Sequence, residues 1–126
     1  MKEFMLLIRN EIDHQAGWSP ERLNRFLKDC EVYIDGLKKD GKLISAQPME
    51  REGRVIFRSD GNWKDKSFKG IKEIIVGYYH VLADNIDDAI DIAKRNPEFQ
   101  YGTTAKIEVR PIKTMEETTG FSYPAK

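Results

Sequence analysis

Residues 72–111, KEIIVGYYHVLADNIDDAIDIAKRNPEFQYGTTAKIEVRP, contain the pattern that decides the fold. The apolar and aromatic run at their start predicts a strand over 72–82. Apolar residues at helical spacing predict a helix over 84–96, which Pro97 stops. A second strand is predicted over 105–112, where polar and apolar residues alternate. Together these elements predict a β-α-β unit.

The first half of the chain predicts a matching β-α-β unit. Short apolar runs predict strands over 4–8 and 42–47. Ser19 offers a helix N-cap and Pro20 suits a first helical turn, so we expect a helix that runs to about Asp40. Spacing predicts the buried stripe of this helix to be Leu23, Phe26, Leu27, Cys30, Ile34 and Leu37. In the second helix it predicts Ile86, Ala89, Ile90 and Ala93 to be buried.

The region between the two units predicts an insertion. Residues 54–58 predict another short strand, and Asp60-Gly61-Asn62 is a strong turn signal. Residues 63–70 are rich in lysine and lack alternation, so we expect an irregular loop there.

The order of elements predicts an α+β fold of the ferredoxin-like β-α-β-β-α-β type, with an inserted short strand or hairpin. Both helices would cover one face of the sheet, and the other face would expose Ile and Tyr side chains. A second copy of the chain is the simplest cover, so we predict a homodimer with its sheets face to face, a dimeric α/β barrel. Residues 1–114 are predicted to form this domain, and 115–126 a C-terminal tail.

The composition argues against several classes of partner. The 126 residues include 21 basic and 21 acidic side chains, so no global field attracts nucleic acid or an anionic membrane. No apolar run approaches the roughly 18 residues of a membrane span, and the N-terminal run is too short for a secretory signal peptide. Cys30 is the one cysteine, which excludes an intrachain disulfide and suggests a reducing compartment. We therefore expect a cytoplasmic protein with no membrane or nucleic-acid partner.

Five short motifs, in order along the chain, resemble those of a known family. They are Met5-Leu6-Leu7-Ile8, GKLISAQP at 41–48, Asp60-Gly61-Asn62-Trp63, Lys72-Glu73 with Gly77-Tyr78-Tyr79, and Glu108-Val109-Arg110-Pro111. The chain resembles the YCII-related family in its DGPF-type branch, with Asn62-Trp63 in place of Pro-Phe and a longer segment before Lys72. The resemblance implies a dimeric α+β barrel of largely uncharacterised function. Some relatives have a helix-borne histidine paired with an aspartate. The helix position that matches this histidine falls near Cys30, and this helix contains no histidine. The histidine–aspartate pair is therefore not carried over to this chain.

Polar residues of the predicted sheet indicate a ligand site. Alternation puts Glu108 and Arg110 on one face of the last strand, opposite Ile107 and Val109. Arg110 is suited to bind a carboxylate or phosphate of a ligand. We predict a site for a small, anionic molecule between the sheet and loops, formed by Asp60, Glu73, Tyr78, Tyr79, Glu108 and Arg110. The alternative for the charged members is structural ion pairing within or between subunits.

Two other functions stay open. One is an enzyme in which Glu73 or His80 is the acid–base residue, although Glu73 also suits a structural bond at a strand end. The other is a non-catalytic interaction or regulatory module that uses residues 63–70 or the tail as its contact surface. His14 and His80 lack a second Cys or His at ligand spacing, so no metal site is predicted. No phosphate-binding glycine loop or nucleophile elbow is present, and we predict no cofactor.

Overall fold

The computed structural model describes residues 1–124 and has the predicted α+β, ferredoxin-like arrangement. Its elements are β1 (Lys2–Glu11), α1 (Pro20–Lys39), β2 (Leu43–Pro48), β3 (Arg54–Ser59), β4 (Asn62–Ser67), β5 (Glu73–Ala83), α2 (Ile86–Lys94), a 3-10 turn η1 (Pro97–Gln100) and β6 (Lys106–Pro111).

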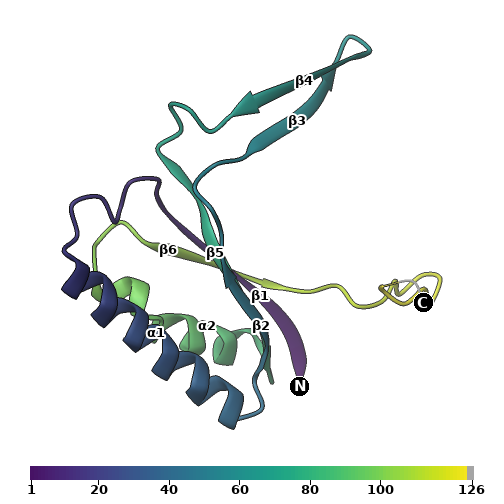
Figure 1. Cartoon of the computed structure of the whole chain (residues 1–126). Coiled ribbons are helices and arrows are strands. Elements are labelled where there is room, and N and C mark those ends of the chain that lie inside the picture. The colour runs from purple at the N-terminus through teal and green to yellow at the C-terminus, as the bar shows by residue number, and fades with distance from the viewer. Residues whose placement is uncertain (125–126) are drawn as a thin grey trace.

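Four strands form the main sheet in the order β2-β5-β1-β6, and every neighbouring pair is antiparallel. This order is the one that two interleaved β-α-β units produce. Both helices lie on one face of the sheet, while the β3–β4 hairpin projects away from it (Figure 1). The sheet of this single chain does not close into a barrel, so the dimeric barrel stays a prediction. Within residues 1–124, no helix has the length and apolarity needed to cross a membrane.

The two faces of the sheet differ in character. On β1, Phe4, Leu6 and Ile8 are buried against the helices, and Asn10 continues the same face. On β5 the helix side continues with Tyr79 and its buried apolar neighbours. The intervening residues of each strand point to the open face, because successive side chains in a strand alternate.

Helix α1 begins as predicted: the Ser19 hydroxyl accepts a hydrogen bond from the Arg22 amide. The predicted buried stripe is confirmed for Phe26 and Leu37. It is wrong for Leu23 and Leu27, which are 36% and 53% exposed. The reason is that both side chains line a pocket between the helix and the sheet rather than closing the core.

Helix α2 begins at Asn85, whose side chain accepts a hydrogen bond from the Asp88 amide. Ala89 and Ala93 are buried as predicted. The prediction is wrong for Ile86, the first residue of the helix, which is 44% exposed, whereas Ile92 is fully buried.

The insertion is a two-stranded hairpin, which we call the arm (residues 54–67). Asp60 and Gly61 form its turn with φ of 51° and 76°, as the turn signal predicts. The expected irregular loop over 63–70 is wrong for its first part, since β4 pairs along its whole length with β3. Both faces of the arm are largely solvent-exposed, so β4 lacks the apolar alternation by which a strand is recognised.

Candidate functional site

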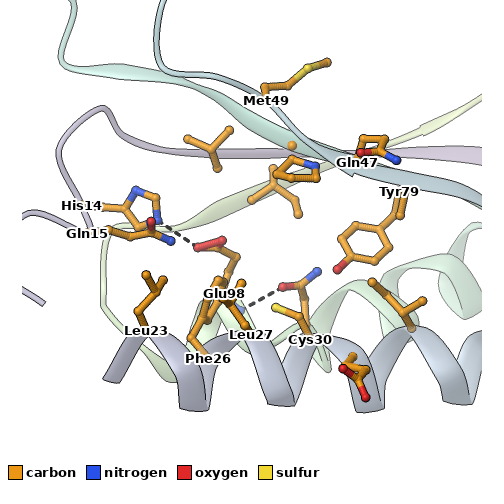
Figure 2. Close-up of a pocket in the computed structure, with 18 of the residues that line it drawn as sticks. His14, Gln15, Leu23, Phe26, Leu27, Cys30, Gln47, Met49, Tyr79 and Glu98 are labelled. Carbon is orange, nitrogen blue, oxygen red and sulfur yellow. Dashed lines mark hydrogen bonds and ion pairs between the residues drawn. The ribbon is translucent and has the colours of Figure 1, made fainter. Parts of the chain in front are cut away.

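A pocket of about 660 Å³ lies between α1 and the β2–β5 side of the sheet. Its apolar wall includes Leu23, Leu27 and Ile34 from α1, with Met49 above them after β2. Figure 2 shows the leucines rising from the helix toward this space, with His14 and Gln15 at one end and Tyr79 and Gln47 at the other. A largely apolar concavity with a few convergent polar groups is the usual form of a small-molecule site.

The polar end of the pocket is built around His14 and Glu98 (Figure 2). His14 lies in the turn after β1, and Glu98 lies in η1, far along the chain. The His14 Nε2 and Glu98 Oε1 atoms are 3.2 Å apart, and the two side chains are 7% and 9% exposed. A histidine and a carboxylate therefore meet, largely buried, at the wall of an open pocket.

The contacts of the His14 ring determine where its protons lie. Nδ1 is 3.0 Å from the carbonyl oxygen of Glu11, and a carbonyl only accepts, so Nδ1 carries a proton. In a neutral ring, Nε2 would then present its lone pair to Glu98 Oε1. Glu98 Oε1 is at ion-pair distance from Nε2, so the two groups form an ion pair whenever the ring carries its second proton. Nε2 has no hydrogen-bond partner among the described residues, because its contact with Glu98 is at ion-pair distance but outside hydrogen-bond geometry.

Buried amides hold Glu98 in place. Asn10 Nδ2 donates to Glu98 Oε1 at 3.4 Å, and the Thr104 hydroxyl donates to Asn10 Oδ1 at 2.6 Å. The Glu98 amide donates to Asn96 Oδ1 at 2.9 Å, because Asn96 caps η1 and Pro97 starts it. Asn10 and Asn96 are 3% and 1% exposed, so two buried groups hold Glu98, Asn10 at its carboxylate and Asn96 at its backbone amide.

Comparison with protein-family models matches residues 2–113 to the YCII-related domain. The chain belongs to the YCII-related family. The match includes every helix and strand described above, the arm included. Comparison with curated proteins finds no match.

Two groups on the pocket wall of this YCII-related chain, Cys30 and Tyr79, have shifted pKa values. Burial, with smaller contributions from the charges of Glu98 and Asp29, raises the pKa of the Cys30 thiol from 9.0 to about 12. Burial also raises the pKa of the Tyr79 hydroxyl above its usual range. Both groups are therefore protonated and neutral at pH 7, and Cys30 is poorly suited to be a nucleophile.

The predicted site residues are not gathered in this pocket. Tyr79 lines it from β5. Asp60 lies in the turn at the tip of the arm, away from the sheet (Figure 1). The strand register places the others on the open face: Glu73, Tyr78, His80, Glu108 and Arg110.

On the open face the charged candidates are paired with neighbouring strands. Lys106 Nζ is 2.9 Å from Glu73 Oε1, and this contact lowers the pKa of Glu73. Arg9 lies 4.0 Å from Glu73 and 3.9 Å from Glu108, with Arg110 Nε 3.7 Å from Glu108. These distances support the alternative of structural ion pairing.

His80 on the same face contacts Glu3 at 2.8 Å. Neither His80 nor Glu73 lines the pocket described above. Among residues 1–124, no group of three or more His, Cys, Asp or Glu is placed to hold a metal ion.

Sequence reasoning missed the pairing of His14 with Glu98. The two residues share no local motif and meet only when η1 packs beside the end of β1. One signal was present: Asn10 continues the buried face after Phe4, Leu6 and Ile8. A polar residue at a core-facing strand position needs a polar partner, and here that partner is Glu98.

Proposed function

We propose that this YCII-related chain is a homodimeric module that binds a small molecule in the pocket between α1 and the sheet. The observation that carries the proposal is the pocket itself, whose apolar wall ends at the buried His14–Glu98 pair. The site predicted from sequence, near Asp60, Glu73 and Arg110, has less support because Glu73 is already neutralised by Lys106. The Asp60-Gly61 hairpin turn supports placement in the DGPF-type branch.

The open sheet face supports the homodimer. It carries Met5 and Leu7, which stay partly exposed in a single chain, and Ile75, which is 42% exposed. Leu7→Lys would place a charge in the middle of this face, so we expect it to yield a monomer by light scattering. Val32→Lys, at a 67% exposed site on α1, is the control and should leave the dimer intact.

The ligand site is tested by filling the pocket. Leu27→Trp adds bulk to a residue of the pocket wall, while Val32→Trp adds the same bulk to the outer side of the same helix. We expect small aromatic and aliphatic fragments to shift amide NMR signals of pocket residues in wild type and in Val32→Trp. Leu27→Trp should lose these shifts. A set of fragments that binds equally to all three proteins, or to none, contradicts the proposal.

A second candidate function is an acid–base enzyme that uses the same pocket. The specific observation in its favour is that His14, whose Nδ1 contacts the Glu11 carbonyl, turns a buried Nε2 without a hydrogen-bond partner in residues 1–124 toward Glu98 at the pocket wall. A histidine beside a carboxylate at a pocket wall suits proton transfer to or from a bound substrate, for example one with an acidic C–H beside a carbonyl. In this role His14 and Glu98 take the place that the sequence prediction offered to Glu73 or His80.

The enzyme candidate is tested by proton exchange in deuterated water. We expect a keto acid that enters the pocket to exchange its acidic C–H faster with wild type than without protein. The His14→Ala and Glu98→Gln variants should each slow this exchange about 100-fold or more. If His80→Ala loses the exchange activity and His14→Ala keeps it, the active site lies on the open face of the sheet instead. Nitrogen NMR of His14 gives an independent check, since a ring without a proton on Nδ1 contradicts the assignment.

A further inference from the structure

The arm exposes apolar side chains that no residue within 1–124 covers. Val55, Ile56 and Trp63 are 51%, 68% and 73% exposed. Arg58 lies over the Trp63 ring at 5.4 Å, which shields one side of that ring only. A two-stranded hairpin without a packed face is marginally stable in water, so the arm needs a surface to lie on.

The C-terminal tail is a second projection with the same character. After β6, the Glu116 amide donates to the Phe121 carbonyl and the Tyr123 amide to the Thr114 carbonyl, both at 2.8 Å. Phe121 and Tyr123 pack edge to face at 5.1 Å, yet they remain 48% and 46% exposed. The tail is thus held by its own hydrogen bonds, and it extends away from the sheet after β6 (Figure 1).

The arm and the tail leave the sheet at diagonally opposite corners. The arm joins β2 to β5 at the end of the sheet where Glu73 pairs with Glu11. The tail follows β6 at the other end, where Pro111 pairs with Phe4. Since β2 and β6 are also the two outer strands, the corners differ in both directions.

We infer that, in the homodimer, the arm of each copy packs against the tail of the other copy. The inference rests on the homodimer of the proposed function. We take the two sheets to pack face to face in the orthogonal arrangement, with strands that cross near a right angle. A two-fold axis along one diagonal of the sheet then superimposes like corners, and an axis along the other diagonal superimposes opposite corners. Like corners would bring two arms together, whereas opposite corners bring each arm to a tail and form both contacts at once.

Charge favours the second arrangement. The arm has four basic and two acidic side chains, and its Arg54 and Asp65 pair with each other at 3.0 Å. Its surplus is therefore basic, and two arms side by side would repel. At the tail, Lys113 pairs with Glu116 at 2.7 Å, and the sequence sets Lys126 against Glu117, so the tail has no surplus charge that would repel the arm. A basic arm therefore meets less repulsion at the tail of the other copy than at a second arm.

The experiment follows Trp63 in the full chain. Because Trp18 is the one other tryptophan, Trp18→Phe leaves Trp63 as the reporter. In the dimer we expect blue-shifted emission and acrylamide quenching several-fold weaker than in the Leu7→Lys monomer. Ending the chain after Thr114 should restore strong quenching while light scattering still finds a dimer.

A matched pair of substitutions measures the contact itself. Ile56→Ser on the arm and Val32→Ser on α1 remove side chains of nearly equal exposure, 68% and 67%. We expect Ile56→Ser to weaken dimerisation about tenfold or more and Val32→Ser to change it less than about twofold.

Each remaining outcome overturns a defined part of the inference. A dimer in which Trp63 is fully quenched contradicts the arm contact and leaves the homodimer standing. Trp63 that stays protected after removal of the tail contradicts the tail as its partner. A wild-type monomer at all concentrations contradicts both the homodimer and the contact. Protection that requires an added single-stranded oligonucleotide would assign the arm to nucleic acid instead.

Discussion

The two faces of the main sheet use the same strands for different purposes. On the helix face, Phe4, Leu6 and Ile8 are at most 4% exposed, and the polar residues that follow them are locked into hydrogen bonds. On the open face, charged residues such as Glu73 and Arg9 form ion pairs with side chains that are about one third or more exposed. A carboxylate is thus buried and held in one orientation on the helix face, as Glu98 is, and belongs to a solvent-exposed set of ion pairs on the open face, as Glu73 does.

The difference lies in how easily water can replace a partner. An exposed ion pair exchanges its partners for water at little cost, so it contributes little to stability and constrains geometry weakly. A carboxylate as enclosed as Glu98, at 9% side-chain exposure, loses much more when its partner is removed. Three predictions test this contrast.

The largest effect is expected from neighbouring leucines of β1. Leu6 is fully buried, whereas Leu7 points to the open face. Leu6→Ala should lower the free energy of unfolding by about 3 kcal/mol, through lost burial and the cavity that it leaves. Leu7→Ala should cost less than about 1 kcal/mol at concentrations where the chain is monomeric. Urea denaturation followed by circular dichroism measures both, and equal losses would contradict the assignment of the faces.

An intermediate effect is expected for the His14–Glu98 pair. A double-mutant cycle with His14→Ala and Glu98→Gln should give a coupling energy of about 2 kcal/mol, because either single change leaves a buried polar partner unmatched. The comparison is a cycle on Lys106 and Glu73 of the open face, where we expect a coupling close to the error of measurement. Similar couplings in the two cycles would remove the contrast between the faces.

The contrast also explains what the sequence can predict. Strand alternation is local, so the placement of Glu108 and Arg110 on one face, opposite Ile107 and Val109, follows from neighbouring residues alone. The caps at Ser19 and Asn85 are equally local. The fold class follows from the order of such elements.

The pocket could not be predicted in this way. Whether Leu27 closes the core or lines a cavity depends on how far α1 stands from the sheet, which no local pattern encodes. His14 and Glu98 come from a turn and a 3-10 segment whose contact is purely tertiary. The prediction from sequence therefore built the site from charged side chains of the strands, such as Glu73, Glu108 and Arg110. In the structure these side chains form ion pairs with one another or with neighbouring strands.

The smallest effect is expected from the pH dependence of Glu73. Its hydrogen bond to Lys106 holds its pKa below the ordinary value of 4.5 in the folded chain. A group with a lowered folded pKa stabilises the fold above its unfolded pKa, and this contribution disappears as the pH falls through the folded pKa. Lys106→Met should therefore reduce stability slightly at pH 7 and make no difference in strong acid.

The side-chain carboxyl signal of Glu73 reports the same event directly by NMR. In Lys106→Met its titration should move up toward the ordinary value, while Lys113→Met, which removes a basic partner of Glu116 in the tail, should leave it unchanged. If the pKa of Glu73 is the same in wild type and in Lys106→Met, the ion pairs of the open face do not orient this carboxylate. A clear shift with a small stability change would instead show that this network sets charge without contributing much to folding, which is the property that separates it from the His14–Glu98 site.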